Sequence, residues 1–408
     1  MRSFIAAVFL ILGWAGPQNP AAPSAKFAWP SGPMEVRVAF DQAVSEANAK
    51  TAVGTEIAIE AEPGKPAVGS LRIAAAHLED GGHTLVLATD PHPFAAIYRP
   101  ASKLLPAYTL GGVAVEFEVD GKPALTSWWP SLDAKNTLAA TASSASHATF
   151  LAATQKPGLL KVRTMVQLPK GKGKLSLTAS HAIIDPVLGL DEIKVDGLSG
   201  AIDFESSGEP KELAFDVKKT EASAAAIFVD ATIAVAGQTP RPLLPAEFAL
   251  PWSTPAPALS ADVKPLPDAM LGGDIAKGKA VFFSETAKCS VCHATKDGGG
   301  KVGPDLTGQR EKDLAMIYRD VLEPSAVVRA DFVAFTVTTK DGQVLAGVAR
   351  ADGADGLLIT DTAAKTTRIL KADIDELRPS ATSAMPVGLP GAIGDAGMRD
   401  LLAYLKSL

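Results

Sequence analysis

The chain has 408 residues but only two cysteines, Cys289 and Cys292. Both lie in one four-residue window, so disulfides cannot join separate parts of the fold. Dense runs of Lys or Arg are also missing, and the formal net charge is -6, which argues against nucleic acid as a partner. After residue 14, no apolar run approaches the ~20 residues that span a bilayer. The sequence therefore predicts domains that are stabilised by hydrophobic cores and not by disulfides.

The N-terminus has the pattern of an export signal. Met1-Arg2-Ser3 supplies one positive charge, an apolar run extends from Phe4 to about Trp14, and a small, Pro-rich stretch follows as far as Ala25. The alternative, a transmembrane anchor, needs a longer apolar run. We therefore predict a secretory signal peptide over residues 1–25 and a periplasmic or cell-surface/secreted protein.

The composition, with 47% hydrophobic and 21% charged residues, supports real cores, and the length favours two to four domains. Apolar and polar residues alternate in Met34–Phe40 and Val113–Val119, and turn residues separate such runs. Short alternating strands at regular spacing favour immunoglobulin-like β-sandwiches. We predict one such domain over residues 26–120 and a second over 121–255, followed by a Pro-rich linker over 256–270.

From residue 271 the pattern becomes helical. Asp274 can cap a first helix, Glu311–Leu322 has helical spacing, and the amphipathic run Met398–Leu405 is near the end of the sequence. Strand patterns return between the second and last helices. The sequence therefore predicts an α-helical domain over 271–408 with a small inserted β-unit at about 330–378.

The sequence Cys289-Ser290-Val291-Cys292-His293 is the signature of covalent haem attachment. Two thiols at this spacing add to the porphyrin vinyl groups, and the adjacent histidine reaches the iron. A zinc site needs further ligands close in sequence, and every other histidine lies in the β-rich half. A redox dithiol of the thioredoxin type would expect a βαβ setting. We therefore predict one covalent haem c on Cys289, Cys292 and His293.

The segment 273–308 resembles the class I c-type cytochromes, since Gly278 and Phe282 precede the attachment motif and Val302–Leu306 follows it. The C-terminal third is closer still to the putative haem-binding domain of planctomycete and verrucomicrobial proteins. The segments that carry this second resemblance are Leu322–Ser325, Thr339–Gly347, Ala372–Ser380 and Ser383–Leu389. The resemblance implies a helical cytochrome c fold in which Gly278 admits Tyr404 and the carbonyl of Pro304 accepts a hydrogen bond from His293.

The resemblance also implies a methionine as the sixth iron ligand. Met385 precedes the last helix in a Pro/Gly segment, which is the expected place, whereas Met270, Met316 and Met398 are less well placed. The predicted metal ligands are thus His293 and Met385. Such ligation leaves no open position on iron and favours electron transfer over oxygen chemistry.

The leading functional prediction is an exported monohaem c-type cytochrome that binds haem and transfers one electron at a time. Its predicted partner is a redox protein, such as a periplasmic dehydrogenase, and an enzyme is disfavoured because the β-rich half shows no catalytic constellation. The alternative is a β-sandwich module that binds carbohydrate or protein, with the haem as sensor or accessory. For His92 we favour a structural role, and for Trp128 and Trp129 core or domain-contact packing over a sugar platform.

Overall fold

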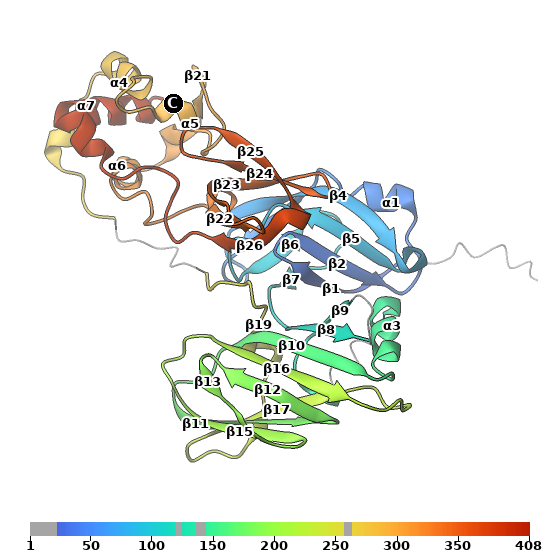
Figure 1. Cartoon of the computed structure of the whole chain (residues 1–408). Coiled ribbons are helices and arrows are strands. Elements are labelled where there is room, and N and C mark those ends of the chain that lie inside the picture. Colours follow the sequence, from blue (N-terminus) through green and yellow to red (C-terminus); the bar gives the residue numbers. More distant parts are fainter. Residues whose placement is uncertain (1–22, 120–123, 136–143, 257–262) are drawn as a thin grey trace, which may run out of the picture.

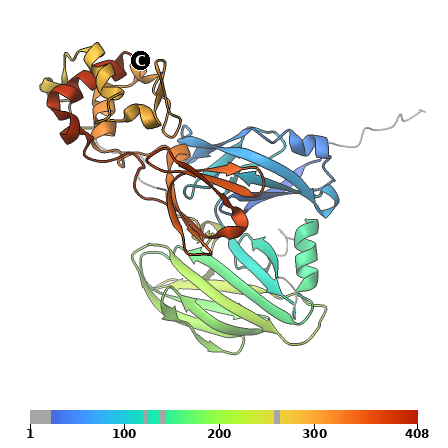
Figure 2. The ribbon, with the colours of Figure 1, turned by 45° about the horizontal axis from the view of Figure 1, so that its top comes forward.

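The computed structural model describes residues 23–119, 124–135, 144–256 and 263–408 (Figure 1). The predicted signal peptide lies almost wholly outside these residues. Two β-rich bodies and a smaller helical group make up the described chain. The helices of this group lie within residues 275–322 and 389–406, at the far end from the second β body in both views (Figures 1 and 2). The described helices are α1 (Glu46–Lys50), α3 (Ala145–Ala153), α4 (Ile275–Phe282), α5 (Cys289–Cys292), α6 (Leu314–Leu322) and α7 (Leu389–Lys406).

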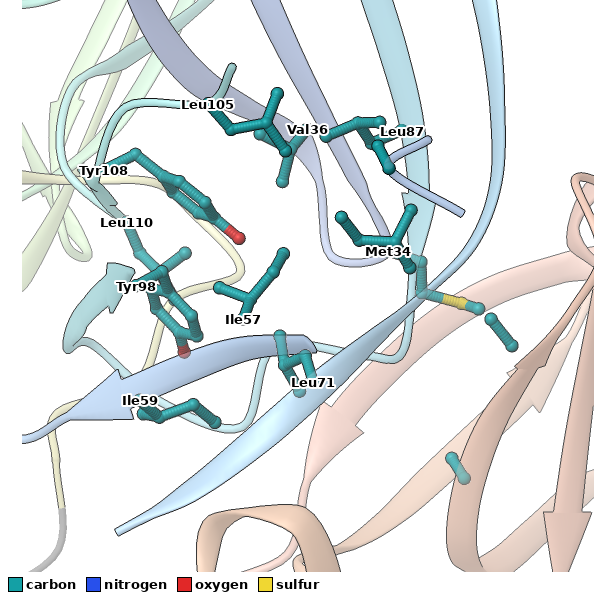
Figure 3. Close-up of a cluster of buried hydrophobic side chains, with 14 of the residues drawn as sticks. Met34, Val36, Ile57, Ile59, Leu71, Leu87, Tyr98, Leu105, Tyr108 and Leu110 are labelled. Carbon is teal, nitrogen blue, oxygen red and sulfur yellow. The ribbon is translucent and has the colours of Figure 1, made fainter. Parts of the chain in front are cut away.

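The first β body begins with an antiparallel seven-stranded sheet. Its strands, in the order in which they pair, are β1 (Ala25–Gly32), β2 (Glu35–Phe40), β5 (Thr84–Thr89), β4 (Gly69–Glu79), β3 (Glu56–Glu60), β6 (Ile97–Pro100) and β7 (Tyr108–Thr109). Alternation sends Val36 and Val38 inward from β2, as expected for a pleated strand. Figure 3 shows that apolar side chains from several of these strands point toward one another.

A five-stranded sheet from the C-terminal third completes the first body. Its order is β25 (Thr366–Leu370), β24 (Gly356–Thr360), β23 (Val344–Asp352), β22 (Ala334–Thr339) and β26 (Ile374–Pro379). Phe335, Val337 and Leu357 are buried in the same apolar cluster as the residues of the first sheet. Hydrogen bonds also cross the joint, since Ala351 N donates to Asp90 at 2.8 Å and Ala330 N donates to the carbonyl of Val68 at 3.1 Å.

The predicted fold class is therefore wrong for the C-terminal third. The sequence predicts a helical cytochrome c domain over 271–408 with a small β-insert, but the described chain is mostly β and residues 334–379 form a full sheet. The physical reason is burial, because the apolar face of this sheet is covered by the first sheet and not by the helices. Strand patterning identifies a sheet, but it does not say which other element covers the sheet.

The second β body is a sandwich, so the β-sandwich part of the prediction is confirmed. Its core includes Val162, Leu177, Phe215 and Ile233 from two facing sheets. One sheet runs β13 (Asp191–Glu192), β12 (Ala182–Leu188), β16 (Lys211–Lys219), β10 (Gly158–Val166), β8 (Val113–Glu118) and β9 (Leu125–Trp129), with β19 (Phe248–Ala249) also on β10. The other runs β14 (Lys194–Asp196), β15 (Ser199–Ser206), β11 (Gly171–Ala179), β17 (Val229–Val235) and β18 (Arg241–Pro242).

The helical group has its own small core, which includes Phe282, Ile317, Leu401 and Tyr404. A two-stranded hairpin, β20 (Ala294–Thr295) and β21 (Gly298–Gly299), follows α5 directly. Among the described residues, no helix combines the length and the apolar character needed to cross a membrane.

Candidate attachment site

Helices α4 and α7 cross with their backbones in contact, and this crossing supports the site. A Cβ added at Gly278 would lie 1.9 Å from the carbonyl oxygen of Asp400 and 2.9 Å from Cβ of Tyr404. Asp274 caps α4 by accepting from Ala276 N and Lys277 N, and its own N–H donates to Asp400 Oδ1 at 2.9 Å. Gly278 therefore admits Tyr404, as the sequence predicts.

The two cysteines lie on α5, a single helical turn. Lys288 precedes it in the left-handed region, with φ 51°, and His293 N donates to the carbonyl of Cys289 at 2.9 Å, which closes the turn. Both thiols are free and partly buried. Burial raises the pKa of Cys289 to about 11 and also raises the pKa of Cys292.

The imidazole of His293 is held in one tautomer. Its Nδ1 lies 2.8 Å from the carbonyl oxygen of Pro304. A carbonyl only accepts, so Nδ1 carries the proton and donates, which leaves a lone pair on Nε2 of the neutral ring. Burial lowers the pKa of this histidine, which favours the neutral ring. His293 and Pro304 are thus brought together as predicted, with Nε2 suited to bind a metal.

A glycine-rich loop packs its backbone against this histidine. A Cβ at Gly303 would lie 2.6 Å from Cε1 of the His293 ring, and a Cβ at Gly299 would lie 2.1 Å from the His293 carbonyl oxygen. Gly300 is similarly close to the carbonyl of Val291. Only glycine permits such an approach. Gly303 lies in the segment Val302–Leu306 noted above, whereas Gly299 and Gly300 were not predicted, although the run Gly298-Gly299-Gly300 just after the motif indicates close packing of backbone.

Met385 lies in the loop before α7 and packs, half-buried, against the same apolar cluster as Cys289 and Leu306. Its N–H donates to Ser383 Oγ, and Ser383 N donates to Ser325 Oγ beyond α6. Met385 and Cys289 thus border one small core. Met398 is fully buried in that core and Met316 is partly exposed on α6.

The core of the helical group is open in comparison with the other two. It has about as many half-buried apolar members as buried ones, whereas the sandwich core has far more buried members than half-buried ones. Val291, between the two cysteines, is 36% exposed, and Val387, next to the Met385 loop, is 76% exposed. The edge of this core therefore leaves apolar side chains in contact with solvent.

The site is not suited to a bare metal ion. Among the described residues, no three His, Cys, Asp or Glu side chains are grouped so that they could hold one. Zinc bound by protein side chains needs such a group. A haem differs, because the porphyrin nitrogens hold the iron and the protein supplies only axial ligands. The metal-binding prediction therefore finds no supporting group of side chains among the described residues, and His293 and Met385 stay predicted ligands of a haem iron.

The conspicuous residues of the β-rich half have structural roles. Trp129 is buried, and Trp128 Nε1 donates to the carbonyl of Gly111 at 2.9 Å. Trp128, which is half-buried, also stacks on Trp29 of the first body, a contact that agrees with a domain-contact role. His92 is buried between the carbonyl of Pro33 and the hydroxyl of Tyr108.

Comparisons with known proteins give little support for an assignment. No family model matches the chain, and no curated protein matches it. Among solved structures, a PA14 sugar-binding domain from an RTX adhesin is similar at 9% identity and a TM-score of 0.26, covering 35% of this chain and 99% of that one. An anti-sigma factor domain-containing protein is similar at 10% identity and a TM-score of 0.25, covering 56% and 91%. Both TM-scores are too low to carry an argument.

These findings overturn the family assignment. The chain matches no family model, its described part is mostly β, and it holds no group of metal-binding side chains among the described residues. The resemblance to class I c-type cytochromes, and to the planctomycete and verrucomicrobial haem-binding domain, rests on short segments spread over residues 273–389. It does not extend to the fold of the C-terminal third, so the assignment is withdrawn. What remains at the site is its own geometry.

Proposed function

We propose that Cys289, Cys292 and His293 hold one covalently attached haem. The observation that carries the proposal is the fixed tautomer of His293, whose Nδ1 donates to Pro304 and leaves Nε2 as a ligand. The free thiols lie on the preceding turn, and Met385, which borders the same core, would be the second ligand of the iron. A haem bound here supplies one-electron redox chemistry to a partner protein outside the cell's cytoplasm.

The protein contributes three things to such a site. The α5 turn sets the spacing of the two thiols, and the Pro304 carbonyl raises the basicity of His293 through Nδ1. The half-buried apolar residues around Cys289 and Met385 would pack against a bound porphyrin and reduce its contact with water, which favours the less charged, reduced state.

The test is expression of the full chain, with its own N-terminus, in a host that attaches haem to exported thiols. Denatured wild-type protein is expected to keep haem absorbance and to stain for haem on a denaturing gel. The double variant C289A/C292A is expected to lose all covalent haem, while the control S290A, which changes a side chain between the thiols, keeps it. Wild-type protein that carries no haem, in a host that loads a positive control, contradicts the proposal.

A second candidate function is binding of a glycan by the second β body. Gln167, Leu168, Pro169, Lys170 and Glu247 line an open hollow of about 320 Å³, a volume within the usual range of small-ligand sites. Pro169 offers apolar contact and Lys170 offers a charged hydrogen-bond donor, two kinds of contact that a sugar ring can use.

A glycan array probed with the full chain tests this second candidate. Binding that K170A reduces at least tenfold, and that the control K172A on the neighbouring strand β11 leaves unchanged, is the expected result. Failure of the wild-type chain to bind any glycan removes this candidate, and it leaves the haem proposal unaffected.

A further inference from the structure

One carboxylate beside the attachment turn joins three segments of the helical group. Asp297 lies in the turn between β20 and β21, four residues after His293. Its Oδ1 lies 2.8 Å from Nζ of Lys279 on α4, and its Oδ2 accepts from Oη of Tyr404 on α7 at 3.0 Å. Asp297 therefore binds the first and last helices to the hairpin that continues directly from His293.

Burial and charge favour a single geometry for this network. Tyr404 is 2% exposed, and its hydroxyl also lies 3.3 Å from Oγ1 of the buried Thr295. The Lys279 ammonium, followed by the Tyr404 hydroxyl, lowers the pKa of Asp297, so the carboxylate is ionised at neutral pH. Asp297 is an exposed residue, but a hydrogen bond to a charged acceptor is still stronger than a neutral one. The hairpin is thus fixed to the helix crossing.

The hairpin also packs directly against the backbone of His293. A Cβ at Gly299, on β21, would lie 2.1 Å from the carbonyl oxygen of His293, so no space separates the two backbones. Asp297 N also donates to Thr295 Oγ1 at 3.1 Å, which fixes the shape of the turn. A displacement of the hairpin therefore moves His293 relative to Pro304.

We propose that Asp297 is a positioning residue that sets the orientation of the His293 ring through the hairpin, with Tyr404 and Lys279 as its anchors. The inference rests on the proposed function, because the ring orientation matters for redox chemistry only when Nε2 is a ligand. The strength of the bond from Nδ1 tunes a ligating imidazole, so a change in the hairpin changes the reduction potential.

The experiment compares the midpoint potential and the low-temperature electron paramagnetic resonance g-values of the haem-loaded full chain. D297A and Y404F are expected to shift both readouts in the same direction, with D297N intermediate because its amide oxygen still accepts from Tyr404. The double variant D297A/Y404F is expected to shift them no further than D297A alone. E285Q is the matched control, because it removes one negative charge from an almost fully exposed side chain near the same motif.

A second measurement uses the haem-free chain. Nitrogen NMR of the His293 ring is expected to show a weaker Nδ1 hydrogen bond in D297A than in wild type, with no change in E285Q. Shifts in D297A and Y404F that do not exceed those in E285Q, with haem attached, overturn the inference and leave the proposed function intact. A wild-type chain that attaches no haem overturns both. Should D297A fail to fold, Y404F still decides, because it keeps the ring that packs on Phe282.

Discussion

At the residue scale, the clearest constraint is the contact between Gly278 and Asp400. The helices cross so closely that no side chain fits, since an added Cβ would lie 1.9 Å from a backbone oxygen. Both contacting groups are helix backbone, so a side chain at residue 278 would fit only if α4 or α7 shifted. The close crossing of α4 and α7 therefore requires glycine at position 278.

The first prediction follows from this contact. G278A is expected to destabilise the helical group by about 1–3 kcal/mol, the usual cost of overpacking that forces backbone to shift. The measurement is urea unfolding followed by the fluorescence and circular dichroism of the full chain. G391A on α7 is the matched control, because nothing lies within 4 Å of an added Cβ there. Equal stability of the two variants would refute the close crossing.

At the element scale, the joint between the first sheet and the β22–β26 sheet depends on Asp90. This carboxylate is 4% exposed and accepts from Ala351 N at 2.8 Å and from Arg72 N at 3.2 Å, so it binds one backbone group from each sheet. Arg72 Nη2 also donates to the carbonyl of Ala351 at 2.6 Å. Hydrogen bonds through Asp90 and Arg72 thus fix the alignment of the first sheet and the β22–β26 sheet, which also share an apolar core.

The second prediction concerns this joint. D90A leaves two amide groups without their acceptor, at an expected cost of about 2–4 kcal/mol. Differential scanning calorimetry of the full chain provides the measurement. D361A is the control, since Asp361 also accepts from two backbone amides, Ala363 N and Lys365 N, but in an exposed turn within one sheet. A cost no larger than that of D361A would show that Asp90 does not align the sheets.

Local structure was largely predictable from the sequence, because alternation and helical spacing are local signals. The run Met34–Phe40 contains β2, the run Glu311–Leu322 contains α6, and Met398–Leu405 lies within α7. The packing of the β22–β26 sheet on the first sheet was not predictable, because the apolar pattern of a strand does not indicate which other element covers it. At the site, the bond from His293 to Pro304 was expected, whereas Asp297 was missed because a lone acidic residue in a turn has no sequence signature.

At the scale of the whole molecule, two buried histidines lie where its parts meet. The ring of His147, on α3, makes edge contacts with Phe27 and Trp29 of β1, and its Nε2 donates to the carbonyl of Trp128 at 2.9 Å. His92 packs beside Trp252, which follows the second body. Burial lowers the pKa of each to about 4, from an ordinary value of 6.5.

The third prediction is a loss of stability in mild acid. Well above pH 6.5 both histidines are neutral in the folded and the unfolded state. There they contribute no pH dependence to the free energy of unfolding. Between pH 6.5 and about 4 only the unfolded chain takes up these protons, and each histidine lowers the free energy of unfolding by about 1.4 kcal/mol per pH unit. Chemical denaturation at pH 7.0, 6.0 and 5.0 is the measurement. The variant H92Q/H147Q is expected to flatten this slope, whereas H77Q, at an exposed position, leaves it unchanged.

The fourth prediction concerns the independence of the two β bodies. A fragment of residues 23–256 lacks the sheet that covers the first body, so its apolar face is exposed. The sandwich in this fragment is expected to resist amide hydrogen exchange, while β2, β3 and β4 exchange rapidly. Strong protection of both parts would show that the first sheet is stable without its cover.

The shared core of the first body also determines the order in which the chain can mature. Ribosomes release residues from the N-terminus onward, yet the first sheet obtains its covering strands only when β26, about 340 residues later, has been made. The sandwich between them can fold while the first sheet still waits. Closure of the first body is therefore a late event, and the Cys289 turn is synthesised before it.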